Sequence, residues 1–164
     1  MSDDGLWTYF YGLAANPLTK AHERIVRSIL EESNAYKMII GVTDHDYKKF
    51  AFPFQIRMEM AEAVFKDLVD AGRVQLVRQD RRTWRFLTES LPQVDGIIVG
   101  EDEWQDLMDG KWSKSQDILE TWPVRVMMRT DGISSTKVRE LIDKGLPLDD
   151  VLPKKVIEII NANR

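Results

Sequence analysis

Cysteine is absent from this sequence of 164 residues, which excludes disulfide bonds, thiol nucleophiles and thiolate metal ligands. The chain also lacks any apolar run near the roughly 20 residues that a membrane-spanning helix needs. Its acidic start, Met1–Gly5, contains no signal-peptide core and is expected to be a frayed end. These absences favour a cytoplasmic protein without a membrane partner.

An excess of positive charge is missing as well. Lys and Arg total 23 against 27 Asp and Glu, so the formal net charge is −4. Proteins that bind nucleic acid usually present a basic surface, and this balance argues against a nucleic-acid partner. A local phosphate site stays compatible with it, because a few basic side chains suffice there. The length suits one domain over residues 1–164.

Short apolar runs alternate with amphipathic segments along the whole chain. The runs are β-rich and continuously apolar, as in KMIIGVT at Lys37–Thr43, which is typical of buried parallel strands. Five strands are predicted, at Leu6–Tyr11, Lys37–Thr43, Val74–Arg78, Val94–Val99 and Val124–Arg129. Helices are predicted at Lys20–Glu32, Phe54–Asp70, Thr83–Ser90, Glu101–Met108, Ser113–Glu120, Ser134–Lys144 and Pro153–Asn161. This order predicts a Rossmann-like α/β fold, a five-stranded parallel sheet with helices on both faces.

The stretch Leu6–Glu32 joins a strand, a loop of small residues and the start of a helix. The loop spans Gly12–Asn16, and the helix begins near Lys20. Free backbone N–H groups and the positive end of the helix dipole make such a junction suitable for phosphate. His22 lies in the first helical turn, at the carboxyl end of the first strand, where α/β folds bind ligands. Taken alone, a histidine there is more often a core residue than a ligand.

A second candidate anion site follows the fifth strand, in RTDGISSTKVR at residues 129–139. Ser134, Ser135 and Thr136 stand at a predicted helix start, where hydroxyls cap the helix or donate to a phosphate. Arg139 follows Ser135 by four residues and Thr136 by three, so these side chains share a face. A guanidinium beside hydroxyls at a helix N-terminus suits an anion. An ordinary N-cap with an exposed arginine explains the same residues equally well.

Together the two stretches resemble the HxGH-type nucleotidylyltransferase superfamily. Its first motif, a small-residue loop, a proline and (H/T)xGH, corresponds to Asn16–His22, and its ISSTxxR motif corresponds to Ile133–Arg139 without a mismatch. Three positions depart from the usual pattern. Ala21 stands in place of Gly, Asn16 in place of a common Asp, and Thr19 where many members have His. The resemblance spans nearly the whole chain.

The resemblance implies transfer of a nucleoside monophosphate from a triphosphate to an acceptor phosphate, with pyrophosphate leaving and no covalent enzyme intermediate. It implies that His22, Thr19 and Arg139 are catalytic. His22 would steady the transition state, Thr19 would donate near the α-phosphate, and Arg139 would hold the β- and γ-phosphates. The residues expected to bind the nucleotide are Gly12, Ala14, Ala15, Asn16, Gly100, Asp102, Ser134, Ser135 and Thr136. Mg²⁺ is expected to arrive on ATP, without a metal site of the protein itself, and homo-oligomers are common among such relatives.

Three branches of the superfamily differ in their acceptor. The adenylyltransferases that make NAD precursors have a strand ending in G-x-D and a Trp-bearing segment, similar to Gly100–Trp104 and Trp112, and a helix start similar to that at Arg57. An aromatic ring beside a pyridinium gains about 1–2 kcal/mol. Rim packing explains both tryptophans nearly as well. The expected acceptor-binding residues are Lys48, Lys49, Arg57, Trp104 and Trp112.

The other two branches fit the sequence less well. Phosphopantetheine adenylyltransferases of coenzyme A biosynthesis share Thr19 and the lysine pair, but their basic stretch is replaced by the acidic Gly100–Glu103. Cytidylyltransferases acting on a small phosphorylated alcohol share the RTEGIST-like residues 129–135, but usually keep both histidines of the first motif. We therefore rank transfer of AMP from ATP to nicotinate or nicotinamide mononucleotide first. A non-catalytic nucleotide sensor is the alternative from another class, and ligand contact by Arg81 and Arg82 stays open.

Overall fold

Five parallel strands form a single sheet in the computed structural model, which describes residues 5–45, 50–128 and 132–163. The strands are β1 (Trp7–Leu13), β2 (Ala35–Thr43), β3 (Val74–Gln79), β4 (Gly96–Gly100) and β5 (Val124–Met127). They lie in the order β3-β2-β1-β4-β5, and every pair is parallel. The predicted five-stranded Rossmann-like sheet is confirmed.

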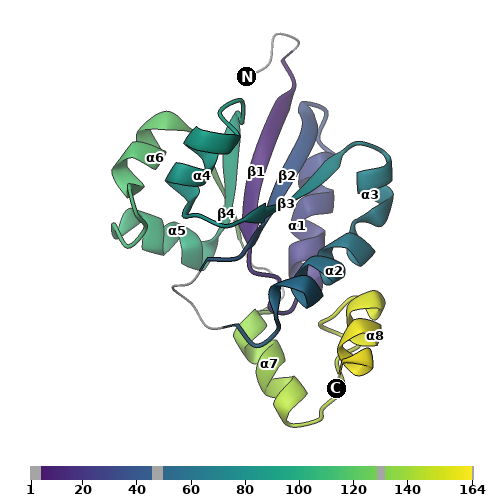
Figure 1. Ribbon diagram of the computed structural model, residues 1–164. Helices are drawn as coiled ribbons and strands as arrows, with labels where there is room; N and C mark the ends of the chain where they lie inside the picture. Colours follow the sequence, from purple (N-terminus) through teal and green to yellow (C-terminus); the bar gives the residue numbers. More distant parts are fainter. Residues whose placement is uncertain (1–4, 46–49, 129–131, 164) are drawn as a thin grey trace.

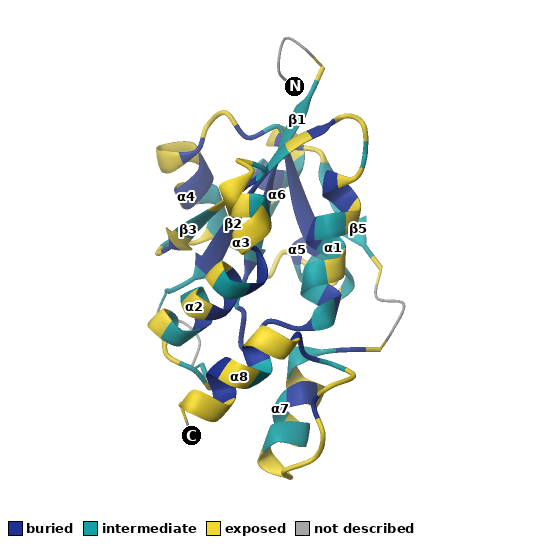
Figure 2. Ribbon diagram, turned by 90° about the vertical axis from the view of Figure 1, so that its right-hand side faces the viewer, coloured by how far each residue is buried: buried dark blue, intermediate teal, exposed yellow. Residues whose placement is uncertain are grey.

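Helices cover both faces of this sheet because successive side chains of each strand point to opposite sides. Tyr9 and Tyr11 of β1 join one hydrophobic cluster, whereas Phe10 joins the other. The first cluster is covered by α1 (Lys20–Leu30), α2 (Phe54–Val64) and α3 (Lys66–Asp70), and the second by α4 (Thr83–Ser90), α5 (Glu101–Met108) and α6 (Ser115–Thr121) (Figure 1). Figure 2 shows the central strands largely buried and the exposed residues on the outer sides of the helices.

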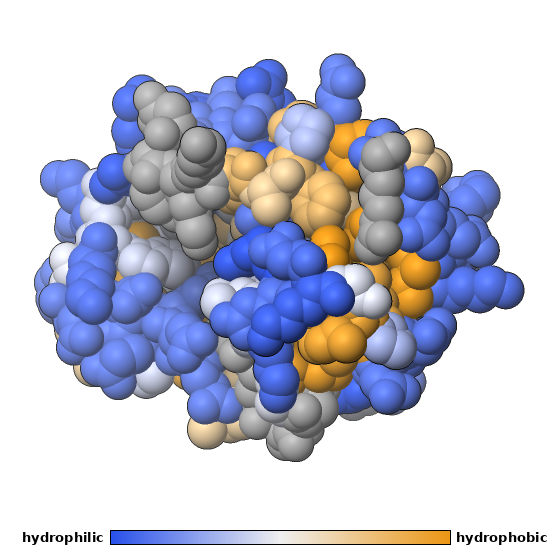
Figure 3. Space-filling model, turned by 90° about the horizontal axis from the view of Figure 1, so that it is seen from below, coloured by the Kyte–Doolittle hydropathy of each residue, from blue (hydrophilic) through white to orange (hydrophobic). Residues whose placement is uncertain are grey.

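The last two helices, α7 (Ser135–Asp143) and α8 (Lys154–Ala162), lie at the end of the sheet where the parallel strands finish (Figure 1). Val138 of α7 and Val156 of α8 are fully buried and extend the first cluster downward. The connection between them is tied to α1, since Lys20 N donates to Val151 O at 2.9 Å and Lys20 Nζ donates to Asp149 O at 2.6 Å. Figure 3 views this end from below and shows apolar side chains gathered beside hydrophilic ones.

The prediction of one continuous helix over Phe54–Asp70 is wrong. The helix is interrupted at Phe65, whose φ of −104° and ψ of 15° lie outside the helical range, and α3 begins at Lys66. Phe65 is completely buried, so the interruption places this ring in the core. The other predicted elements are present with small shifts at their ends. Arg129, the predicted end of the last strand, lies outside the described residues.

In the described part of the chain, none of the helices combines the length and apolar character needed to cross a bilayer.

Gly41 in β2 packs directly against the ring of Phe10 on β1. A Cβ added at Gly41 would lie 2.8 Å from Phe10 Cζ and 3.0 Å from Gln79 Oε1. Gly41→Ala is therefore expected to lower the free energy of unfolding by about 1–3 kcal/mol, measured by urea denaturation. In a Phe10→Leu background, where a smaller side chain replaces the ring, Gly41→Ala should lower the free energy of unfolding by less. Equal costs in both backgrounds would contradict this packing explanation.

Glu32, just after α1, forms an ion pair with Arg125 of β5. The hydrogen-bonded guanidinium lowers the pKa of the Glu32 carboxyl from its ordinary value. Because the folded pKa is the lower one, the pair stabilises the protein above the unfolded pKa, and this contribution disappears as pH falls through the folded pKa. Both side chains are more than a third exposed, so the expected contribution is at most about 1 kcal/mol. Glu32→Gln should lower stability in urea denaturation at neutral pH and leave it unchanged in strong acid.

Candidate functional site

A cavity of about 780 Å³ opens at the carboxyl edge of the sheet. The strand order reverses between β1 and β4, and open α/β sheets bind ligands at such a switch point. One wall comes from the end of β1 and the following loop, including Gly12, Ala14 and Asn16. Gly100 and Asp102, at the end of β4 and the start of α5, form the opposite wall. The cavity therefore lies at the edge of the sheet where the sequence predicts a ligand.

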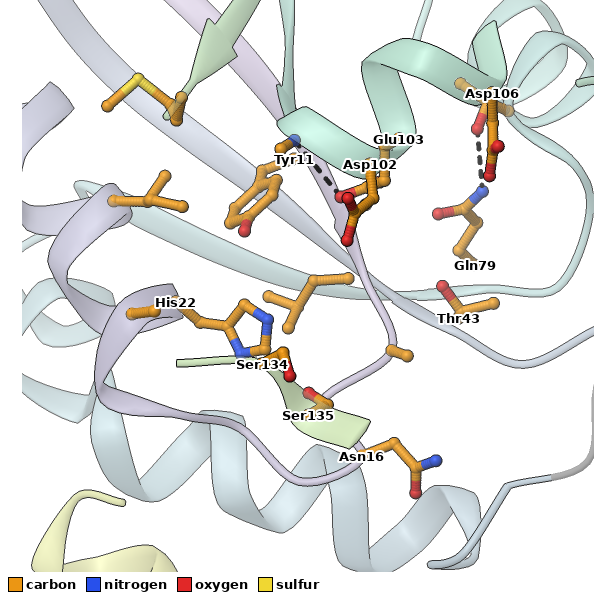
Figure 4. Close-up of a pocket in the computed structure, with 18 of the residues that line it drawn as sticks. Tyr11, Asn16, His22, Thr43, Gln79, Asp102, Glu103, Asp106, Ser134 and Ser135 are labelled. Atoms are coloured by element: carbon orange, nitrogen blue, oxygen red, sulfur yellow. Dashed lines mark hydrogen bonds between the residues drawn. The ribbon is translucent and has the colours of Figure 1, made fainter. Parts of the chain in front are cut away.

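His22 is held at the first turn of α1 by a reciprocal capping arrangement with Thr19. The Thr19 hydroxyl accepts a hydrogen bond from His22 N at 3.3 Å, while Thr19 N donates to His22 Nδ1 at 3.0 Å. Because a backbone N–H can only donate, Nδ1 is the acceptor and the ring proton belongs on Nε2. The imidazole lines the cavity and points into it (Figure 4). The site thus contains an imidazole N–H donor in a fixed orientation.

The start of α7 docks on the loop that precedes α1, and so the two sequence motifs meet in space. Ser135 Oγ donates to Pro17 O at 3.3 Å, and Arg139 Nη1 donates to Asn16 O at 2.7 Å. Arg139 Nη2 also donates to Thr136 Oγ1 at 3.2 Å. These contacts join residues more than 110 positions apart in the chain. His22 and the first turn of α7 consequently face the same cavity.

Hydroxyl groups cluster where α7 begins. Ser134 is the N-cap, with its hydroxyl accepting from Lys137 N at 3.2 Å. Ser134, Ser135 and Thr136 all line the cavity, and Figure 4 shows the first two next to the His22 ring. Together with Arg139, they present cationic and neutral donors to one small volume. This composition suits phosphate oxygens rather than a metal cation.

The opposite wall is acidic and comes from α5. Glu103 Oε1 accepts a hydrogen bond from Gly100 N at 3.4 Å, which is drawn as a dashed line in Figure 4. Asp102 and Asp106 of the same helix also line the cavity. Carboxylates accept hydrogen bonds from sugar hydroxyls and oppose an extra phosphate, so the two walls favour different parts of a nucleotide.

Most residues that the sequence predicts for the site line this cavity. They are Gly12, Ala14, Asn16, His22, Gly100, Asp102, Trp112, Ser134, Ser135, Thr136 and Arg139. Lys48 and Lys49 lie outside the described residues.

Four other predicted site residues do not line the cavity. Thr19 is only 1% exposed and engaged with His22, so its position does not fit the predicted contact with the α-phosphate. Ala15 is fully buried, with a φ of 54°, below the loop surface. Trp104 packs against the core under α4, α5 and α6, in agreement with the packing alternative.

Arg57 also requires a correction, because its side chain is 1% exposed and lies beneath the loops instead of in the cavity. Its donors bind the backbone oxygens of Ala14, Thr43 and Phe52. The predicted contact of Arg57 with the acceptor does not fit this position.

Several cavity residues were missed by the sequence analysis. Ala21, Arg24, Ile25 and Ser28 form an i, i+3, i+4, i+7 set on α1, a signal that was available from helical spacing. Thr43 and Gln79 stand at the ends of β2 and β3, at the same edge of the sheet as His22. Gln79 Nε2 donates to Arg81 O at 3.1 Å and lies 3.4 Å from Thr83 Oγ1. Arg82, left open by the sequence, lines the cavity as well.

The cytidylyltransferase-like family matches this chain over residues 10–141, which include both motifs and all of the cavity residues named above. The chain belongs to this family and is a nucleotidyltransferase.

Individual similar proteins are named more narrowly, as adenylyltransferases of nicotinic acid mononucleotide. A probable nicotinate-nucleotide adenylyltransferase of Lactococcus lactis is 24% identical over 177 residues, covering 91% of this chain and 89% of the relative. The crystal structure of a putative nicotinate-nucleotide adenylyltransferase from Vibrio parahaemolyticus has a TM-score of 0.75 at 20% identity, covering 96% of this chain and 93% of that one. Plasmodium falciparum nicotinic acid mononucleotide adenylyltransferase, complexed with NaAD, has a TM-score of 0.70 at 16% identity, covering 96% of each chain.

Proposed function

We propose that this protein transfers AMP from ATP to nicotinate or nicotinamide mononucleotide, producing a dinucleotide and pyrophosphate as a step of NAD biosynthesis. The observation that carries the proposal is the junction of His22, Asn16 and Arg139 at one end of a two-walled cavity. The names of the similar proteins support a pyridine mononucleotide as acceptor. The cavity volume of about 780 Å³ lies in the range of small-molecule sites.

The proposed reaction is a displacement at the α-phosphorus of ATP. A phosphate oxygen of the acceptor forms a new P–O bond there, and the bond to the bridging oxygen of the β-phosphate breaks. The electron pair of that bond leaves with pyrophosphate. Catalysis then requires alignment of the acceptor oxygen with the leaving oxygen, and stabilisation of charge on the transferring phosphate.

The side chains that face the cavity suit these two requirements. The Nε2–H of His22 is held in one direction by Thr19, so it can donate to an α-phosphate oxygen without reorganisation. Arg139 and the hydroxyls of Ser134 and Thr136 provide donors for the β- and γ-phosphates, whereas the hydroxyl hydrogen of Ser135 is donated to Pro17 O. No group on the protein needs to accept or release a proton in the proposed step.

Mg²⁺ is proposed to enter with ATP. Among the described residues, no group of three or more His, Asp or Glu side chains is arranged to hold a metal ion. The donors at the α7 end are N–H and O–H groups, which match phosphate oxygens and leave the cation to phosphate and water ligands. Bound in that way, it would offset part of the triphosphate charge.

The acceptor is proposed to occupy the end of the cavity that Trp112 lines. Lys111, from the α5–α6 connection, and Arg82, at the start of α4, line the cavity as well, and Lys111 is paired with Asp106. An aromatic ring suits a planar pyridinium, and the nearby cations suit its carboxylate or phosphate. The acidic α5 wall opposes an acceptor with several phosphates, in agreement with the ranking from the sequence.

A panel of acceptors tests the proposal. Pyrophosphate release is measured with ATP or CTP and with nicotinate mononucleotide, nicotinamide mononucleotide, phosphopantetheine or glycerol phosphate. The expected result is turnover with ATP and at least one pyridine mononucleotide. Turnover with CTP alone, or with phosphopantetheine alone, would replace the proposal by one of the other branches. Nucleotide binding, seen as a raised melting temperature, without any turnover would indicate a sensor.

A further inference from the structure

Arg57 is a buried cation that lies directly behind the functional cavity. Its guanidinium donates from Nε to Phe52 O at 2.9 Å, and from Nη1 to Ala14 O at 2.8 Å and Thr43 O at 2.7 Å. The carbon of the guanidinium also lies 3.8 Å from the centre of the Phe50 ring. In the described part of the chain, its hydrogen-bond acceptors are backbone oxygens rather than carboxylates.

These carbonyls belong to three segments that are separate in sequence and adjacent at the cavity. Ala14 is in the loop before α1, Thr43 ends β2, and Phe52 lies in the loop before α2. Ala14, Thr43 and Phe50 line the cavity themselves. One planar group therefore sets the distances among three pieces of the cavity wall.

Asn16 connects this buried group to the anion site. Its side-chain Oδ1 accepts hydrogen bonds from Ala51 N at 3.0 Å and Phe52 N at 3.1 Å. Its backbone oxygen accepts from Arg139 at 2.7 Å. A continuous set of direct hydrogen bonds thus runs from Arg139 through Asn16 to the 50–52 loop, and from that loop to Arg57.

We infer that Arg57 is a positioning residue: through the backbone of Ala14, Thr43 and Phe52, it fixes the phosphate-binding loop relative to the rest of the cavity wall. This inference rests on the proposed function, because such spacing affects catalysis only where two substrates must be aligned. Lysine cannot replace Arg57, since one ammonium group cannot reach the three carbonyl oxygens that the planar guanidinium binds. Displacement of a cavity wall by about 1 Å can cost up to a hundredfold in rate.

Arg73 provides a matched control within the same chain. Its guanidinium binds three backbone oxygens as well, with Nε donating to Tyr36 O and Nη2 donating to Leu30 O and Ala35 O. These contacts lie at the opposite end of the sheet, where β2 and β3 begin. Arg73→Lys therefore removes the same type of interaction without disturbing the cavity wall.

The test compares Arg57→Lys with Arg73→Lys at a temperature where melting curves show both to be folded. Arg57→Lys is expected to lower kcat about tenfold, whereas Arg73→Lys keeps the wild-type kcat. An unchanged kcat in Arg57→Lys, or equal losses in both variants, would overturn the inference. Arg57→Gln is the second variant if Arg57→Lys does not fold.

Hydrogen exchange separates this inference from the proposed function. Arg57→Lys should increase exchange together in peptides covering residues 12–18, 40–45 and 50–57, while Arg73→Lys leaves all three unchanged. Faster exchange confined to 50–57 would also overturn the inference. If the wild-type protein shows no turnover with any acceptor, the proposed function fails, and the exchange comparison alone decides the role of Arg57.

Discussion

His22→Ala should lower kcat by about 10²–10³-fold, while ATP binding and the melting temperature change little. The imidazole points into the cavity, and its Nε2–H is oriented by the backbone of Thr19. Such a donor contributes most when charge develops on the transferring phosphate, so its loss appears in kcat more than in ATP affinity. Pyrophosphate release at saturating substrates gives kcat, and calorimetric titration gives the ATP affinity.

Variants of Thr19 provide the control for this interpretation. Thr19→Ser keeps a hydroxyl at the N-cap and should retain wild-type kcat. Thr19→Val has a similar shape without the hydroxyl, so it should weaken the cap by about 1 kcal/mol and lower kcat through a less ordered imidazole. Wild-type kcat in His22→Ala would mean that the imidazole has no part in the transition state. Equal effects of the two Thr19 variants would mean that the hydroxyl does not position it.

Much of this architecture follows from patterns within short segments. The apolar runs that predict the strands are local in sequence, and the parallel order then requires their carboxyl ends to meet at one edge. That edge contains His22, Gly100 and the start of α7. The first motif and the ISSTxxR motif were therefore expected on one cavity, although the individual contacts of Arg139 with Asn16 and Thr136 were not.

The side chains that sequence patterns misplaced depend on tertiary contacts. Arg57 has the charge of a surface or ligand-binding residue, and nothing near it in sequence indicates that three carbonyl oxygens from separate segments surround it. Burial lowers the pKa of its guanidinium, while the charge of Asp44 opposes that shift. A buried arginine of this kind can be recognised only when the loops are placed in space.

Trp104 shows a second reason why the sequence misplaces a side chain: neighbouring residues on a helix point in different directions. Asp102, Glu103 and Asp106 of α5 line the cavity, whereas Trp104 packs on the core. One residue along a helix turns the side chain by about 100°, so Trp104 faces the core although Glu103, one position earlier, lines the cavity. Trp112 follows α5 in the next connection and does line the cavity. Proximity to the strand end was therefore a poor guide to which tryptophan faces the site.

Arg139→Ala should reduce kcat/KM for ATP by about a hundredfold and also lower the melting temperature. The guanidinium faces the cavity and donates to Asn16 O and Thr136 Oγ1, so its removal takes away a cationic donor and a link between the two motifs. Arg139→Lys keeps the charge but cannot make both contacts at once. It should retain part of the ATP affinity while losing the ordering of the loop, and an intermediate kcat/KM is expected.

Lys137→Ala is the matched control on the same helix, because this exposed lysine carries the same charge and does not line the cavity. It should leave kcat/KM for ATP unchanged. A similar loss of kcat/KM in Lys137→Ala and Arg139→Ala would mean that only the overall positive charge of α7 matters, and not the position of Arg139. Loss confined to Arg139→Ala, with partial recovery in Arg139→Lys, would indicate that a cation at this position contacts the triphosphate and that the guanidinium does so best. Raised salt separates these cases further, since long-range attraction is screened above about 0.1 M whereas a direct charge-assisted hydrogen bond is affected far less.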